Sequence, residues 1–79
     1  MPTREELEEE DRRVRQLRLV VDLALSVIAQ TEMSLAQAQE MVAATRGTAL
    51  RLFPDKGHAF DLIYLPRFHR LLEERYGLS

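Results

Sequence analysis

Apolar residues in the first third of the chain repeat at the spacing of an α-helix that ends near Gln30. Five of them step by three and four positions and form one stripe: Val14, Leu17, Val21, Ala24 and Ile28. A second stripe consists of Val20, Leu23 and Val27. A helix with two stripes is expected to be buried on two sides. One side would cover the rest of its own chain, and the other would cover a second copy.

The middle of the chain carries the signals of two short helices. Ser34 is a suitable N-cap residue, and Gln37 three positions later completes a capping box for a helix over residues 35–43. Thr45 is the expected cap of a further helix over residues 46–52. A tight turn would join the two.

The last third of the chain predicts two more helices. The pair Phe53-Pro54 should end the preceding helix, and Asp55 is the next cap candidate, for a helix that runs to Ile63 or Tyr64. Pro66 fits the first turn of a fifth helix, which Gly77 would end. No run alternates apolar and polar residues for long enough to form a strand. The predicted class is all-α, with about five helices and no sheet.

Charge divides the 79 residues into two parts. Residues 1–11 hold six acidic side chains and one basic one, whereas residues 12–79 hold ten basic and seven acidic side chains. We interpret residues 1–11 as an acidic tail or frayed helix, and residues 12–79 as a single helical domain. A domain this small, without cysteine to form a disulfide, is often completed by a partner subunit.

Several classes of protein are not expected. The most apolar run, residues 17–29, contains two charged side chains and is too short to span a membrane, so we predict a soluble, cytoplasmic protein with no membrane partner. No catalytic constellation or glycine-rich phosphate loop is present, so we do not expect an enzyme. The pairs His58/Asp61 and His69/Glu73 each supply two metal ligands without a third, and we expect no metal and no cofactor.

The segment over residues 34–53 has the layout of a helix-turn-helix, in which the second helix enters the major groove of DNA. That helix would open with Thr45-Arg46-Gly47-Thr48. The cap hydroxyl and the free N–H groups of a helix start suit a phosphate oxygen, and Gly47 would allow close approach of the backbone. Arg46 and Thr48 could donate to base edges, with Arg51 one turn further along.

The same segment resembles the DNA-binding domain of the tetracycline-repressor (TetR) family. The resemblance rests on Ser34-Leu35, on Gly47-Thr48 and on Phe53-Pro54-Asp55-Lys56. The spacing of these three motifs matches the pattern of the family without a gap. It implies that Ser34 and Thr45 touch phosphates, that Arg46 and Thr48 face the groove, and that Lys56 clamps a phosphate. The family's large C-terminal effector domain has no counterpart here. We therefore expect no small-molecule effector.

The sequence predicts a DNA-binding transcriptional regulator, a homodimeric repressor that reads a short palindromic operator in double-stranded DNA. The expected DNA-binding residues are Ser34, Thr45, Arg46, Gly47, Thr48, Arg51 and Lys56. The dimerisation candidates are Val14, Leu17, Val21, Phe68, Leu72 and Tyr76. The alternative is a small helical protein–protein interaction module, an adaptor or antitoxin-like protein, that does not bind DNA.

Overall fold

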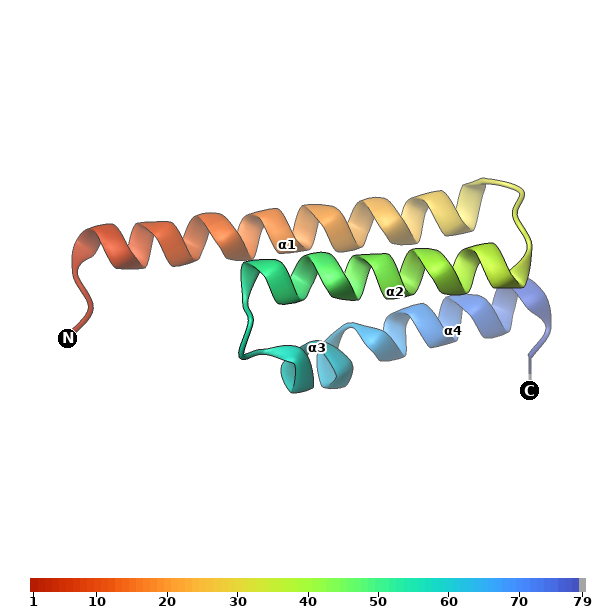
Figure 1. Ribbon diagram of the computed structural model, residues 1–79. Helices are drawn as coiled ribbons and strands as arrows, with labels where there is room; N and C mark the ends of the chain where they lie inside the picture. The colour runs from red at the N-terminus through yellow and green to blue at the C-terminus, as the bar shows by residue number, and fades with distance from the viewer. Residues whose placement is uncertain (79) are drawn as a thin grey trace.

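The computed structural model describes residues 1–78 and contains four helices in this range (Figure 1). They are α1 (Arg4–Gln30), α2 (Leu35–Leu52), α3 (Gly57–Ile63) and α4 (Leu65–Tyr76). No strand occurs among the described residues. The all-α class is therefore confirmed, whereas the expectation of five helices is wrong, because two of the predicted helices are one.

Helix α1 begins within the acidic segment. Thr3 is its N-cap, and the Thr3 Oγ1 accepts a hydrogen bond of 3.1 Å from the backbone N–H of Glu6. Glu5 and Glu6 lie in the first turn, where negative side chains interact favourably with the positive end of the helix dipole. From Arg4 onward, the acidic segment is thus the first part of α1.

Helix α2 begins as expected but does not stop where the turn was predicted. The Ser34 Oγ accepts from the backbone N–H of Gln37, and the Gln37 side chain accepts from the backbone N–H of Ser34, which confirms the capping box. The helix then continues through Thr45 to Leu52. The predicted turn, and with it the helix-turn-helix over residues 34–53, is not formed. Alanines at positions 43 and 44 favour helix, and no residue there interrupts the backbone hydrogen bonds.

Helices α3 and α4 follow Phe53-Pro54, which ends α2 as predicted. Helix α3 begins at Gly57 rather than directly after Asp55, and its N-cap residue, Lys56, makes no side-chain capping bond. Pro66 lies in the first turn of α4, where its missing N–H is not needed. Gly77 ends α4 with φ 66°, a left-handed conformation that favours glycine.

Helices α1, α2 and α4 pack along one another, and α3 closes one end of this bundle (Figure 1). The core contains residues of all four helices: Val21, Ala24, Ile28, Ala38, Val42, Ala49, Phe60, Phe68 and Leu72. The stripe predicted on α1 supplies three of these side chains. The most deeply buried large ones are Phe68, Ile28 and Val21.

The C-terminal end of α4 holds the loop between α1 and α2. The Arg75 guanidinium donates to the carbonyl oxygens of Ala29 at 3.1 Å and Thr31 at 2.6 Å. The Tyr76 hydroxyl donates to the carbonyl oxygen of Met33 at 2.9 Å. These bonds satisfy carbonyl groups that the end of a helix and its loop leave without partners.

Helix α1 is longer than the bundle that it belongs to. At 1.5 Å per residue, its 27 residues span about 40 Å and the 18 residues of α2 about 27 Å. The Arg13 guanidinium lies 5.6 Å from the centre of the Phe53 ring, so Arg13 marks the level at which α2 ends. Residues 4–12 of α1 extend beyond this level (Figure 1). We call residues 4–12 the overhang.

Candidate functional site

The residues expected to bind DNA do not gather at one place. Ser34 is at the N-terminal end of α2, and Arg51 lies 17 residues later in the same helix. At 1.5 Å per residue this separation is about 25 Å. Lys56 is exposed beyond the C-terminal end of α2. Ser34 thus lies at one end of the bundle and Lys56 at the other.

The hydroxyl groups of the predicted reading helix bond to that helix itself. Thr45 is only 5% exposed, and its Oγ1 donates to the carbonyl oxygen of Met41 at 2.8 Å. The expectation that Thr45 caps a new helix is therefore wrong. The Thr48 Oγ1 donates to the carbonyl oxygen of Ala44 at 3.1 Å and accepts from Arg51 at 2.9 Å. Bonds from Thr to the carbonyl four residues earlier are an alternative to capping within a helix.

Arg46 forms a bidentate ion pair that joins α2 to α3. Its Nε lies 2.7 Å from Asp61 Oδ1, and its Nη2 lies 3.0 Å from Asp61 Oδ2. The hydrogen bond and the positive charge lower the pKa of Asp61, and the same hydrogen bond with the negative charge raises the pKa of Arg46. Two parallel N–H···O bonds fix the guanidinium in one orientation. Arg46 thus serves the fold in this structure and does not point freely outward.

Two glycines contribute to this region in different ways. Gly47 lies inside α2, and an added Cβ would meet only the Arg51 guanidinium, at 4.0 Å. At Gly57 a Cβ would lie 3.1 Å from Leu50 and 3.2 Å from the Arg46 guanidinium. Gly57 therefore allows Arg46 to cross the start of α3 on its way to Asp61. Sequence reasoning missed this role because it depends on a contact between separate helices.

The dimerisation candidates separate into two groups. Val21, Phe68 and Leu72 are buried in the core of their own chain, and Tyr76 holds the α1–α2 loop. These four side chains are already used within one chain. Val14 and Leu17 are only partly buried and lie near the overhang.

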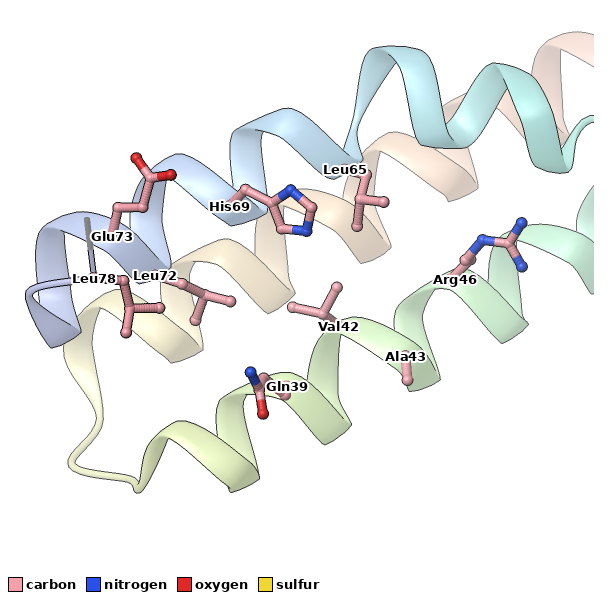
Figure 2. Close-up of a pocket in the computed structure, with 9 residues that line it drawn as sticks. All are labelled: Gln39, Val42, Ala43, Arg46, Leu65, His69, Leu72, Glu73 and Leu78. Carbon is pink, nitrogen blue, oxygen red and sulfur yellow. The ribbon is translucent and has the colours of Figure 1, made fainter.

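A shallow apolar hollow of about 390 Å³ lies between α2 and α4 (Figure 2). Its apolar lining consists of Val42, Ala43, Leu65, Leu72 and Leu78. Gln39, His69 and Glu73 contribute polar groups, and the His69 ring points into the space between the two helices (Figure 2). Arg46 also borders the hollow, but its guanidinium is held by Asp61. The polar groups therefore do not converge on one point.

A second apolar groove, of about 220 Å³, lies where the overhang leaves the bundle. Three helices and the segment after α2 line it: Glu10, Val14, Leu17, Ala49, Phe53, Lys56, Ala59, Phe60, Ile63 and Tyr64. Ile63, which lines this groove, is 60% exposed. We call this the α1–α3 groove.

The apolar stripe of α1 extends beyond the bundle. Leu7, Val14, Val21 and Ile28 are spaced by seven residues and therefore share one face of the helix. Ile28 and Val21 are fully buried, Val14 is partly buried in the α1–α3 groove, and Leu7 is 50% exposed on the overhang. Apolar residues at this spacing thus extend from the core to the overhang, where Glu10 and Asp11 lie between Leu7 and Val14 on the same face. Sequence reasoning began this stripe at Val14 and missed Leu7, although the spacing of seven could have found it.

Other kinds of site have little support in the part of the chain that the structure describes. Within residues 1–78 no three histidine or acidic side chains are placed to hold a metal ion. In the same range, no helix is long and apolar enough to cross a membrane.

Comparisons with known proteins suggest no function for this chain. The chain matches no known protein family, no curated protein and no solved structure.

Proposed function

We propose that this protein is a helical protein–protein interaction module that docks through the overhang of α1 and the α1–α3 groove. The observation that supports this most strongly is the series of apolar residues spaced by seven on α1, which runs from the buried Ile28 and Val21 through Val14 to the exposed Leu7. Ile28 and Val21 hold the bundle together, Val14 lines the groove, and Leu7 is exposed on the overhang. An amphipathic helix that binds in an apolar groove is a common mode of protein recognition.

The surface around the groove suits a protein partner better than DNA. Ile63 of α3 lines the groove and is exposed, so the groove has an apolar margin. The residues expected to read DNA are engaged within the chain, with Thr45 buried and Arg46 paired to Asp61. Sequence-specific DNA binding therefore stays a prediction from the sequence, and it lacks the projecting helix start on which it depended.

The proposal can be tested by site-specific photo-cross-linking. The cross-linker replaces Ile63, and the protein is expressed at its natural level in its own cells. We expect one or a few discrete polypeptide adducts, which disappear when Val14→Asp is added to fill the groove with a charge. The matched control places the same cross-linker at Ala36, which is exposed on α2 at the other end of the bundle. The absence of adducts from Ile63 would contradict the proposal, and equal adducts from Ala36 would count against it in the same way.

Binding to random duplex DNA at low and high salt gives the complementary test. If the protein is an interaction module of this kind, the wild type should be retained on heparin no more strongly than a double variant with Lys56→Ala and Arg51→Ala. Strong duplex binding that falls steeply with salt and is lost in this variant would favour the regulator predicted from the sequence.

A further inference from the structure

Opposite charges occupy consecutive seven-residue blocks of α1. Residues 5–11 contain six acidic side chains and no basic one, and we call them the acidic block. Residues 12–18 contain four arginines and no acidic side chain, and we call them the basic block. The boundary between them, at residues 11 and 12, lies at the point where the overhang meets the bundle.

The fold of a single chain uses few of these charges. Among residues 1–78, the two blocks make only two ion pairs, Arg4–Glu8 at 3.5 Å and Arg12–Glu9 at 2.6 Å, and all four side chains are more than half exposed. Exposed pairs of this kind contribute little to stability. The helix dipole accounts for acidic residues in the first turn only, because its effect falls off beyond that turn. Apart from Arg13, whose guanidinium lies over the Phe53 ring, the other charges of the two blocks make no ion pair among residues 1–78.

We propose that the occupant of this surface is a second copy of the same chain, with the two α1 helices antiparallel about a twofold axis near residues 11 and 12. This inference rests on the proposed function, since it names the partner of the same docking surface. An antiparallel arrangement places the acidic block of each copy along the basic block of the other. A parallel arrangement would place acid beside acid and base beside base, which is unfavourable.

The apolar residues fit the same arrangement. With the axis near residues 11 and 12, Leu7 of the second copy comes to the level of residue 16, between Val14 and Leu17. These two residues line the α1–α3 groove, so the exposed part of one apolar stripe meets the groove of the other copy. Lys56 also lines this groove and adds a positive charge that faces the incoming acidic block. By symmetry, the contact occurs twice, as in an isologous dimer.

Charge reversal tests the arrangement in solution. The acid-to-base variant carries Glu9→Lys, Glu10→Lys and Asp11→Lys, which leaves Thr3, Glu5 and Glu6 to cap the helix. The base-to-acid variant carries Arg12→Glu, Arg15→Glu and Arg18→Glu. The control variant carries Glu40→Lys, Glu73→Lys and Arg70→Glu, which alter exposed charges on α2 and α4. Circular dichroism on each variant confirms that it is helical, and sedimentation equilibrium over a range of concentrations measures its mass.

We expect a dimer for the wild type and for the control, and a dimer affinity lower by about tenfold or more for each block variant alone. Mixing the two block variants in equal amounts should restore a dimer, because the reversed blocks again oppose each other with opposite charge. Raising the salt concentration should weaken the wild-type dimer. A wild type that stays monomeric at millimolar concentration, or block variants that dimerise as the wild type does, would overturn this inference. In the cross-linking experiment above, an adduct with another polypeptide and none with a second copy would overturn it while leaving the proposed function intact.

Discussion

Arg46 and Asp61, fifteen residues apart in the sequence, meet through two hydrogen bonds of 2.7 and 3.0 Å and join α2 to α3. This pair is the only ion pair between α2 and α3 in the part of the chain that the structure describes. It also bears on the base contact predicted for Arg46, because the Nε and Nη2 groups of its guanidinium are already bonded to Asp61.

The pair should make the stability of the fold depend on pH in the acidic range. Because Arg46 lowers the pKa of Asp61 in the folded state, the contribution of this carboxylate is present above its ordinary pKa of about 3.9. It is lost as the pH falls through the lower, folded value. Thermal unfolding from pH 7 to pH 2 should therefore show a smaller loss of stability for Asp61→Asn than for the wild type. The matched control is Asp55→Asn, whose carboxylate forms no ion pair with any residue from 1 to 78. If Asp55→Asn behaves as Asp61→Asn does, the Arg46 pair is not the cause.

Gly47→Ala should stabilise the protein by about 0.5–1 kcal/mol, since Gly47 lies inside a helix with space for a methyl group. Chemical denaturation with urea measures the change. The control is Gly77→Ala, which should destabilise the protein because Gly77 adopts φ 66°. If Gly47→Ala proves destabilising, the helix does not run continuously through this position.

Ile28→Ala should cost about 2–5 kcal/mol of unfolding free energy, because Ile28 is fully buried among α1, α2 and α4. Leu19→Ala removes a large aliphatic side chain from the same helix, but Leu19 is 68% exposed, and the change should be within about 0.5 kcal/mol. Urea denaturation of both variants checks the difference. Similar losses for the two would mean that the outer face of α1 is also covered.

Tyr76→Phe should cost about 0.5–1.5 kcal/mol, because the Tyr76 hydroxyl donates to the carbonyl oxygen of Met33 and the ring stays in place without it. Thermal unfolding followed by circular dichroism gives the measurement. Tyr64→Phe is the comparison, since the Tyr64 hydroxyl makes no hydrogen bond to another side chain or backbone group within residues 1–78. An equal effect of both changes would show that the loop bond to Met33 contributes nothing.

Helix ends that depend on local chemistry were predictable from the sequence. Gln30, the Ser34 capping box and Gly77 each lie where neighbouring residues alone decide the backbone conformation. The turn before Thr45 was not predictable in this way, because a threonine can cap a new helix or bond to the carbonyl of an existing one. Burial of Thr45 against the neighbouring helices decides between the two, and burial is a property of the whole fold.

The candidate site depended still more on distant contacts. The periodicity of α1 correctly placed Val21, Ala24 and Ile28 in the core. It could not show that α2 ends at the level of Arg13, which is what leaves Leu7 exposed. The length of the neighbouring helix α2 therefore decides which residues of the stripe are buried and which are exposed.

Because α1 runs from the core into solvent, the free energy of opening its backbone hydrogen bonds should differ widely from one end of the helix to the other. Backbone amides near Val21 and Ile28 should exchange with solvent only on global unfolding, whereas those of the overhang can exchange by local opening of the helix end. Hydrogen-exchange rates along α1 therefore form a graded scale from one end to the other. If amides of the overhang become protected from exchange as the protein concentration rises, the concentration at which this happens is the one at which the overhang binds a second copy.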